Sequence, residues 1–504
     1  MRGILSMVFV GILLGRSEQA NILMMATLMS HSHHFWNEAI AIGLVDKGHN
    51  VTVLSHDYTQ IKRDNFTVIT IDGAYDTFAY AYKGSSWRRF SLTPFNLRAL
   101  VDDFNHYFNI ELCEFDLNHP AFDALLSYPD DFKFDLILWD HTAGECLYPV
   151  IERFGNPPLV GLSPYGLTNS IEALYGGHVY PYIGQIIMPF TIATTLWQRL
   201  FNTIYINYSN YKRISYLKPV SVEVSQTKFP NWNIEKFEEV ENRFSLCFVN
   251  WNVALNHAQP MNPNIIPVGG VQIKEKELLP KDIQEIFSKP SKGVIYFSLG
   301  SNIKSEYLSL ELLQSFGDCF AELSDYQVLW KLEPPANLSL PTNVVTVKWA
   351  PQTAVLAQKK TKMFITHGGG LSTQETTYAG VPIVALPLFL DQINNAEKLR
   401  ERGGGETVTL EELEDPSQNI FCKRVKQVLH NACYTRTMKD SSAKYRDVKV
   451  KPLDEAVFWT EYVLRHGDIK HLSPKSRSMN CFVEFDNLLA LEREHETSLF
   501  PLRQ

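Results

Sequence analysis

The chain has little that would mark a metal-binding, disulfide-rich or nucleic-acid-binding protein. Its seven cysteines among 504 residues include no CxxC pair, which argues against a zinc ribbon or a dense disulfide framework. Lys and Arg number 47 against 55 Asp and Glu, for a formal charge of −8, and there is no basic block. Nucleic-acid binding needs a basic footprint, so the sequence predicts no nucleic-acid partner. Apolar residues make up 45% of the chain, which excludes a disordered protein.

The sequence also has no apolar run long enough to span a membrane, which takes about 20 residues. The run from Ile4 to Leu14 follows one Arg and precedes the small residue Ala20, a pattern typical of a signal peptide over 1–20. The divergent tail over 471–504 carries charges throughout. We therefore expect delivery to the endoplasmic reticulum lumen, with a soluble lumenal or secreted product.

Four sequons fit passage through that lumen. They begin at Asn50, Asn65, Asn207 and Asn337. The longest stretch without Asp, Glu, Lys or Arg runs from Ala173 to Gln198, and it contains His178 and two prolines. Because such residues are costly in lipid, we interpret this stretch as an apolar pocket wall or a surface that touches a membrane, not as a span.

Short β-rich runs alternate with helical patterns along the chain, which is typical of parallel α/β sheets. A strand from Asn21 (NILMMATL) is followed by a loop, a helix over about Phe35 to Asp46, a stop at Gly48 and the strand VTVLS. The apolar residues that predict the core-facing stripe of this helix are Phe35, Ala39, Ile42 and Val45. A second α/β series begins at GVIYFSLGS, residues 293–301.

These two series predict two α/β domains, over 21–270 and 293–450, joined by a polar linker over 271–292. The part from about 165 to 245 is aromatic-rich and less regular. An amphipathic helix from Asp454 to Gly467 follows the second domain. Two such domains that face each other place a cleft at the carboxyl ends of both sheets, where open α/β sheets bind their ligands.

The densest signal lies between Trp349 and Gln392, in the runs WAPQ, FITHGGGLSTQE and GVPIVALPLFLDQ. FIT ends a strand, His367 and three glycines form a loop, and a helix with Ser372 in its first turn follows. Free N–H groups at that helix start, close backbone approach at the glycines and the His donor suit a diphosphate. Glu375 projects from the same helix as an acceptor for vicinal hydroxyls, as an acid does for ribose in dinucleotide folds.

The flanking residues suit the rest of a nucleotide ligand. Trp349 offers a flat face for a base, and the amide of Gln352 can orient that base. Asp391 and Gln392 open the next helix after Pro387, again at the carboxyl end of a strand. A glycine triplet alone is usually a turn and a strand-end Trp alone is usually core, so it is their joint order and spacing that predicts a binding site.

The run from Trp349 to Gln392 resembles the signature of the UDP-glycosyltransferase family, the glucosyl- and glucuronosyltransferases of lipophilic small molecules. The resemblance extends over most of the chain through SHHFWNEAIAIGLVDKGHNVTVLS, FSLGS and VFWTEYVLRHGDIKHL, and its wording is most similar to invertebrate members. It implies an α/β fold of the GT-B type, with two facing Rossmann-like domains. The first would hold the acceptor and the second the UDP-sugar, and the helix over 451–470 would cross back onto the first.

The resemblance also implies roles for individual residues. Trp349 would stack on uracil, Gln352 would help to hold the nucleotide, and Glu375 would take the ribose hydroxyls. The residues implied at the diphosphate are Ser301, His367, Gly369 and Ser372, and those implied at the sugar hydroxyls are Asp391 and Gln392. Where many members carry Asn, this chain has Leu371, so we expect weaker or re-tuned donor binding.

A general base must take the proton of the acceptor hydroxyl, and neutral His suits that task near neutral pH. The candidates are His31, His33 and His34, in the loop between the first strand and the first helix. Counting back from Gly48 to the family's catalytic histidine selects His33, and Asp140, at the end of FDLILWD, matches its acidic partner. The alternatives are a metal site at the three histidines and a helix-capping role for Asp140.

Together these features predict an inverting hexosyltransferase that needs no metal and no cofactor. The resemblance to invertebrate members favours glucose over glucuronic acid in the donor, and the stretch over 173–198 favours a small lipophilic acceptor. A dinucleotide-dependent oxidoreductase is disfavoured because no GxGxxG follows the first strand. A non-catalytic paralogue that binds a UDP-sugar or a lipophile is the remaining alternative.

Overall fold

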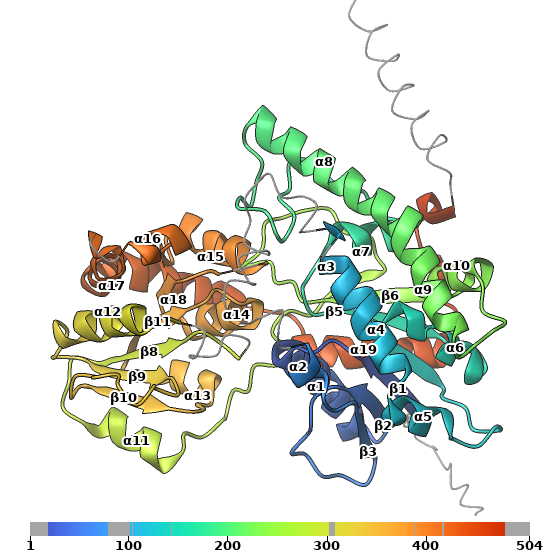
Figure 1. Ribbon diagram of the computed structural model, residues 1–504, viewed down its shortest axis with the longest axis horizontal. Helices are drawn as coiled ribbons and strands as arrows, with labels where there is room; N and C mark the ends of the chain where they lie inside the picture. Colours follow the sequence, from blue (N-terminus) through green and yellow to red (C-terminus); the bar gives the residue numbers. More distant parts are fainter. Residues whose placement is uncertain are drawn as a thin grey trace, which may run out of the picture.

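A computed structural model of the chain describes residues 19–78, 101–102, 104–142, 144–301, 308–388, 390–415 and 418–478. Nearly all of the signal peptide predicted over 1–20, and most of the tail predicted over 471–504, lie outside these residues. Within them the chain forms two α/β domains that stand side by side (Figure 1).

The first domain is built on a seven-stranded parallel sheet in the order β3-β2-β1-β4-β5-β6-β7. Its strands are β1 (Asn21–Ala26), β2 (Asn50–Ser55), β3 (Phe66–Thr70), β4 (Leu136–Asp140), β5 (Leu159–Ser163), β6 (Phe244–Val249) and β7 (Ile265–Pro267). Every residue of β4, β5 and β6 is buried, because helices cover both faces of the sheet. Since the strands run parallel, their carboxyl ends meet at one edge, where β4 ends in Asp140.

The helical segments of the first domain are α1 (His31–Asp46), α2 (Ala74–Thr77), α3 (Phe104–His106), η4 (Tyr107–Glu111), α4 (Leu112–Leu117), α5 (Pro120–Leu126), η5 (Glu145–Leu147), α6 (Pro149–Arg153), α7 (Asn169–Leu174), α8 (Leu196–Lys212), η6 (Arg213–Leu217), α9 (Lys218–Gln226) and α10 (Ile234–Arg243). The part expected to be less regular thus contains a nearly continuous helix from α8 to α9. A capping box between Thr195 and Gln198 starts it. The spacing of its apolar residues did not predict a helix because many of them face outward: Leu196 and Trp197 are 77% and 76% exposed.

The second domain repeats the same strand order with six parallel strands, β10-β9-β8-β11-β12-β13. Its strands are β8 (Val294–Ser298), β9 (Gln327–Lys331), β10 (Val344–Val347), β11 (Thr361–Thr366), β12 (Ile383–Ala385) and β13 (Gly405–Thr407). Its helices are α11 (Lys281–Ser288), α12 (Leu310–Ala321), α13 (Gln352–Leu356), α14 (Gly370–Ala379), α15 (Gln392–Glu401), α16 (Leu410–Glu414), α17 (Ile420–His430) and α18 (Ala432–Arg446). Helix α11 lies within the range expected to be a linker, and its Ile283 and Ile286 pack into the second domain's core.

After the second domain the chain returns to the first. Helix α19 (Pro452–His466) packs against α1 in the first domain (Figure 1), and the short turns η9 (Lys470–Leu472) and η10 (Lys475–Ser478) follow it. A Cβ on Gly43 of α1 would lie 2.8 Å from Cδ1 of Leu453, so the glycine allows the two helices to approach closely.

The cover by α19 explains why the buried stripe of α1 was predicted only in part. Val45 is buried and Ala39 and Ile42 pack against the same core, as expected. Phe35, expected in the core, is 40% exposed, whereas Trp36 and Ile40 are fully buried. A helix that packs against a sheet on one side and another helix on the other buries most of its surface and loses a simple amphipathic period. The helix also begins four residues before the predicted start, at His31.

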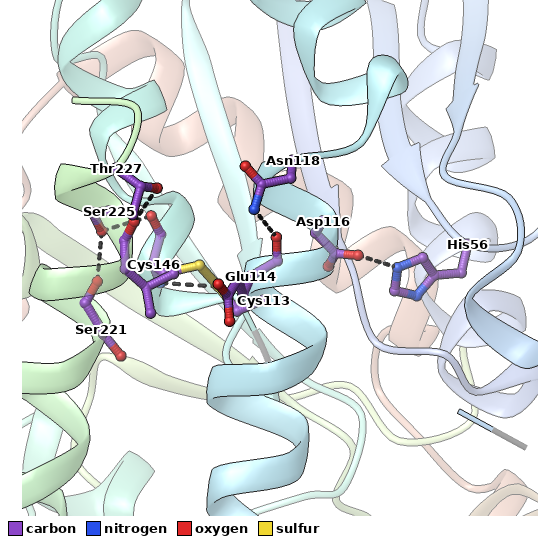
Figure 2. Close-up of a disulfide and its surroundings, with 10 residues drawn as sticks. His56, Cys113, Glu114, Asp116, Asn118, Cys146, Ser221, Ser225 and Thr227 are labelled. Carbon is purple, nitrogen blue, oxygen red and sulfur yellow. Dashed lines mark hydrogen bonds and ion pairs between the residues drawn. A yellow bond between two sulfur atoms is a disulfide. The ribbon is translucent and has the colours of Figure 1, made fainter. Parts of the chain in front are cut away.

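The two domains contact each other directly. Nδ2 of Asn394 in α15 donates to the backbone carbonyl of Phe190 at 3.0 Å, and Gln374 in α14 donates to Asn250 at 2.7 Å. The stretch that precedes α8 therefore rests on the helix that begins at Gln392. Each domain also contains a disulfide, Cys113–Cys146 in the first (Figure 2) and Cys319–Cys422 in the second. Among the residues described, no helix combines the length and the apolar character that a membrane span needs.

Candidate active site

The three candidate histidines lie in the first turn of α1, not in a preceding loop as predicted. Placed on a helix, they face different partners. His31 pairs through Nδ1 with Asp57, while Nε2 of His34 lies 3.6 Å from a carboxylate oxygen of Glu38. The rings therefore do not converge as ligands of one metal ion would, and His33 is the ring directed at the end of β4.

His33 meets Asp140 at the carboxyl end of β4. Nδ1 of His33 lies 3.6 Å from Oδ2 of Asp140 and 3.3 Å from the hydroxyl of Thr142. Asn37, one turn further along α1, donates to the same Asp140 oxygen at 2.8 Å. Burial raises the pKa of the Asp140 carboxyl, but the hydrogen bonds from His33 and the two neighbouring donors outweigh it and leave the pKa below its ordinary value. Asp140 is thus an anion that faces Nδ1, which leaves Nε2 of His33 for an acceptor hydroxyl.

The second oxygen of Asp140 has a local role. Oδ1 accepts the backbone N–H of Thr142 at 3.0 Å and also the Thr142 hydroxyl. One carboxylate thus orders the turn after β4 and faces His33. It does not cap the following helix, because η5 has Gly144 at its N-cap and no side-chain cap. Thr142 and Asn37 were not among the predicted site residues. A Thr two positions after the strand-end acid, and an Asn one helical turn after the His, were the available signals.

On the other side of the cleft, the loop between β11 and α14 holds His367 against two glycines. A Cβ on Gly369 would lie 2.4 Å from Nε2 of His367, and one on Gly300, after β8, would lie 2.5 Å from its Cε1. These glycines let ring and backbone N–H groups approach the same ligand. Burial, and then the charge of Lys331, lower the pKa of His367 to about 4. The ring is therefore neutral at pH 7 and can donate one hydrogen bond to a phosphate oxygen.

Ser372, Gln352 and Glu375 form one hydrogen-bonded group at the starts of α13 and α14. Nε2 of Gln352 donates to the Ser372 hydroxyl at 3.1 Å and to Oε2 of Glu375 at 2.8 Å. Burial raises the pKa of Glu375 to about 7, although hydrogen bonds from Gln352 and Gln272 oppose the rise. The residue expected to bind ribose therefore changes its charge near neutral pH.

Trp349 lies beside a cavity lined from both domains. Its indole is 55% exposed, and Nζ of Lys331 stands 4.2 Å from the ring centroid. Ser301 of the second domain and His31 of the first line the same cavity. Burial lowers the pKa of Lys331 to about 8. Lys331 was not among the predicted site residues, although a Lys that ends the buried strand QVLWK is a recognisable signal.

Asp391 and Gln392, at the start of α15, line one cavity with His33. A single cavity is lined by residues of both domains, which include Ser32, His33, Tyr165, His367, Gly369, Leu371, Asp391 and Gln392. Burial raises the pKa of Asp391, and Asn395 donates to its Oδ2 at 2.6 Å. Leu371 lines this cavity and also packs against the core of the first domain. Leu371, where the resemblance implies Asn, therefore makes an apolar contact between the domains.

A second cavity in the first domain adjoins this one, and the two share Tyr165, Leu390 and Asp391. Leu174, Ile186 and Ile187 form part of its wall, and they belong to the charge-free stretch interpreted as a pocket wall. The rest of the lining is more polar than that interpretation implies. Its polar members include Asn105, Asn109, Glu145, Thr168, Ser170 and Arg213.

Comparison with known proteins agrees with this geometry. The family described as "UDP-glucoronosyl and UDP-glucosyl transferase" matches residues 20–486. UDP-glucosyltransferase 2 of Dactylopius coccus is 29% identical over 487 residues, which cover 95% of this chain and 90% of that protein. Human UDP-glucuronosyltransferase 2B17 is 27% identical over 496 residues, covering 91% and 87%.

Solved structures show the same fold at low identity. The glycosyltransferase VinC in complex with dTDP superposes with a TM-score of 0.57 at 18% identity, over 89% of this chain and 100% of VinC. The calicheamicin glycosyltransferase CalG4 gives 0.56 at 19%, over 89% and 99%. With two parallel sheets of the same strand order and a cleft lined from both, the chain has the GT-B fold and belongs to the UDP-glucuronosyl and UDP-glucosyl transferase family, enzymes that transfer a sugar from a UDP-sugar donor.

Proposed function

We propose that the protein transfers glucose from UDP-glucose to a hydroxyl group of a small lipophilic acceptor, with inversion at the anomeric carbon. The observation that carries the proposal is that His33, with Asp140 behind it, lines one cavity with Asp391 and Gln392. The described lining of that cavity contains no Lys or Arg to pair with the carboxylate of glucuronate, which supports glucose as the sugar. Coupling a sugar to a lipophile makes it water-soluble, so detoxification is the proposed role.

In the proposed reaction, Nε2 of His33 takes the acceptor proton as the acceptor oxygen bonds to the anomeric carbon. The bond from that carbon to the UDP oxygen breaks, and UDP leaves from the opposite face. Asp140 stabilises the imidazolium that forms. The N–H groups at the start of α14 and the neutral His367 stabilise the departing diphosphate, a role that calls for neither a metal nor a cofactor.

The donor roles follow from the same arrangement. Uracil stacks on the exposed indole of Trp349, Gln352 orients the nucleotide, and Glu375 accepts from the ribose hydroxyls. The groups proposed at the diphosphate are Ser301, His367, Gly369 and Ser372. Asp391 and Gln392 take the sugar hydroxyls, because they share the cavity with the proposed base.

The test is release of UDP from UDP-glucose and from UDP-glucuronate, with and without a panel of phenols. Release that requires an acceptor and is faster with UDP-glucose supports the proposal. Binding of UDP-glucose without release would instead identify a non-catalytic paralogue. His33→Ala should lower kcat by about a hundredfold or more, the usual contribution of a general base. His34→Ala is the matched control, because His34 is equally buried on the same helix turn but faces Glu38.

We further propose residence in the endoplasmic reticulum lumen. The two disulfides support an oxidising compartment. Asn50 and Asn65 are half-buried and their amides bond to residues distant in the chain, whereas Asn207 and Asn337 are exposed, so the latter two are the proposed glycan sites. The amide of Asn207 donates only to the carbonyl of Thr203, one turn earlier in α8, among the described residues. Loss of gel mobility shifts in Asn207→Gln and Asn337→Gln, but not in Asn50→Gln, would support this assignment.

The outward face of α8 bears on membrane contact. Leu200 and Ile204 are 45% and 47% exposed, and Asn207 follows them at helical spacing on the same face. This apolar stripe supports contact with a membrane surface, but a glycan on Asn207 would cover it. Vesicle flotation of the Asn207→Gln protein, compared with the glycosylated form, separates the two proposals.

A further inference from the structure

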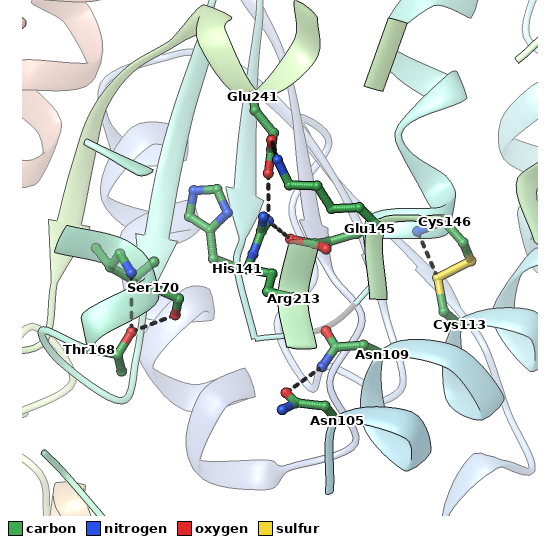
Figure 3. A network of polar contacts seen from close by, with 12 residues as sticks. Asn105, Asn109, Cys113, His141, Glu145, Cys146, Thr168, Ser170, Arg213 and Glu241 are labelled. Carbon is green, nitrogen blue, oxygen red and sulfur yellow. Dashed lines mark hydrogen bonds and ion pairs between the residues drawn. A yellow bond between two sulfur atoms is a disulfide. The ribbon is translucent and has the colours of Figure 1, made fainter. Parts of the chain in front are cut away.

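Two residues that line the acceptor-side cavity belong to a buried charge network that the transfer reaction does not use. NH2 of Arg213 lies 2.5 Å from carboxylate oxygens of both Glu145 and Glu241 (Figure 3). Nζ of Lys218 lies 2.5 Å from the other oxygen of Glu241. Glu145 and Arg213 line the cavity, whereas Glu241 and Lys218 stand behind them.

The network is balanced in charge. Its two carboxylates face two cations, so it does not call for a charged ligand. Burial alone would lower the pKa of Arg213, but Glu145 and Glu241 more than compensate and raise it. Burial alone would raise the pKa of Glu241, but Arg213 and Lys218 outweigh it and lower this pKa. Arg213 and Glu241 therefore form an ion pair near neutral pH.

The cavity side of this network offers hydrogen-bond acceptors. Oε1 of Glu145 accepts from Arg213, while Oε2 has no hydrogen-bond partner among the described residues. Nδ2 of Asn109 donates one N–H to Asn105 at 3.4 Å, and the carbonyl oxygen of Asn109 can accept a hydrogen bond from a ligand. Figure 3 shows Asn105 and Asn109 grouped beside the Glu145–Arg213 pair.

The rest of the cavity is suited to an apolar body. Ile171, Leu174, Ile186 and Ile187 line it, and Thr142, next to the catalytic pair, lines it too. A molecule whose reacting hydroxyl lies at His33 would thus pass along an apolar wall and meet Glu145 and Asn109 with its far end. A purely apolar far end would displace water from these acceptors and leave them without partners, which is costly in a buried site.

We propose that the acceptor carries a second, uncharged hydrogen-bond donor such as a hydroxyl at the end remote from the transferred hydroxyl, and that Glu145 and Asn109 bind it. This inference rests on the proposed function for its direction along the cavity. Sites built to bond a hydroxyl reject analogues that lack it more strongly than apolar pockets reject a missing methylene. The preferred substrates are therefore small amphipathic diols in place of simple lipophilic phenols.

The test compares 2-naphthol with 2,6-dihydroxynaphthalene, by equilibrium binding and by UDP release from UDP-glucose. The wild-type enzyme should bind the diol about tenfold more tightly, as expected for one hydrogen bond to a charged group. The same preference should appear in kcat/KM after correction for the two equivalent hydroxyls. Equal binding of the two compounds by the wild-type enzyme would overturn the inference, whatever the variants do.

Two variants locate the effect. Asn109→Ala and Glu145→Gln should each reduce the preference for the diol without changing the KM for UDP-glucose. Ile187→Val is the control, because it trims the apolar wall and should affect both compounds alike. A preference for the diol that survives unchanged in both folded variants would also overturn the assignment. If the diol preference in binding holds but neither compound releases UDP, the proposed function fails and the binding inference stands.

Discussion

The donor and acceptor halves of the cleft are built in different ways. Most of the proposed donor contacts come from one stretch of chain, Trp349 to Gln392, where consecutive strand ends and helix starts meet. Apart from Leu390 and Asp391, the proposed acceptor cavity is lined by separated pieces of the first domain, around 105–109, 141–145, 163–174, 185–187 and 205–217. A common donor can be recognised by one compact motif, whereas the acceptor surface is assembled from loops and helices that can vary independently.

The largest expected effect belongs to the acceptor half, at Asp140. Asp140→Asn keeps the shape but removes the charge that faces His33, so kcat should fall by about a thousandfold, as when the acid of a catalytic triad is neutralised. The KM for UDP-glucose should change little, because Asp140 lies in the acceptor half. Steady-state kinetics measure both. Asp57→Asn is the matched control, since Asp57 pairs with His31, and equal losses in the two variants would contradict the assignment.

A donor-only effect is expected at Trp349. Trp349→Ala removes the stacking surface and should weaken UDP-glucose binding by about tenfold, since base stacking on an aromatic ring contributes ~1–3 kcal/mol. Acceptor binding should be unchanged. Calorimetric titration of both ligands checks the split, with Trp197→Ala, an exposed tryptophan on α8, as the control. A similar loss of acceptor affinity would contradict the prediction that Trp349 contributes to donor binding alone.

The affinity for UDP-glucose should depend on pH through two residues of the donor half. Glu375, with a pKa raised to about 7, becomes the carboxylate that ribose needs as the pH rises, whereas Lys331, with a pKa lowered to about 8, then loses its positive charge. A plot of UDP-glucose affinity against pH should therefore be bell-shaped, with its maximum between these two pKa values. One pH unit below the pKa of Glu375 the affinity should be roughly fivefold lower than at the maximum. Titrations from pH 6 to 9 measure the profile.

Two variants assign the limbs of that profile. Glu375→Gln should flatten the acidic limb and Lys331→Met the alkaline limb. His367, with a pKa lowered to about 4, stays neutral throughout this range. Binding of an uncharged acceptor should show neither limb, and a bell-shaped acceptor profile would argue against confining these groups to the donor site.

The smallest expected effect concerns Leu371, where the halves touch. Leu371→Asn places an amide at the proposed diphosphate site and should tighten UDP-glucose binding by about threefold, the contribution of one modest hydrogen bond. Leu371→Ala removes the interdomain packing without adding the amide, so it serves as the comparison. Isothermal titration of both variants distinguishes them, and equal affinities would mean that the amide contributes nothing here.

The same contrast explains which features were predictable. The strands of both sheets are short apolar runs bounded by turns, so the local sequence pattern was enough to predict the two sheets. The donor motif lies within one such series of strands and helices, so the same pattern placed it at strand ends and helix starts. His33 was selected correctly as the ring that meets Asp140, but its place on α1 depended on a helix start that the loop-like SHSHH hid. The buried stripe of α1 depends on Leu453, more than 400 residues away, which no local period can reveal.

Features that depend on distant pairs were missed for the same reason. Cys113 and Cys146 are 33 residues apart and Cys319 and Cys422 are 103 apart, and their pairing follows from tertiary proximity alone. The polar side of the acceptor cavity pairs Glu145 in η5 with Arg213 in η6. The prediction rested only on the charge-free stretch between them, so it identified the apolar wall of the pocket and missed this ion pair. Lys331, in contrast, could have been predicted locally, because a Lys at the end of a buried strand is visible in the sequence.

The return of α19 to the first domain has a consequence for synthesis. The helix that carries His33 is among the first structures to leave the ribosome, yet the side of α1 at Gly43 is covered only when Leu453 has been made. Domains usually fold as units during synthesis, the first before the second. Here the first domain must wait for the end of the chain with part of its core uncovered. A nascent chain that stops before α19 would therefore present an apolar patch to chaperones, and the enzyme is completed only when α19 closes over α1.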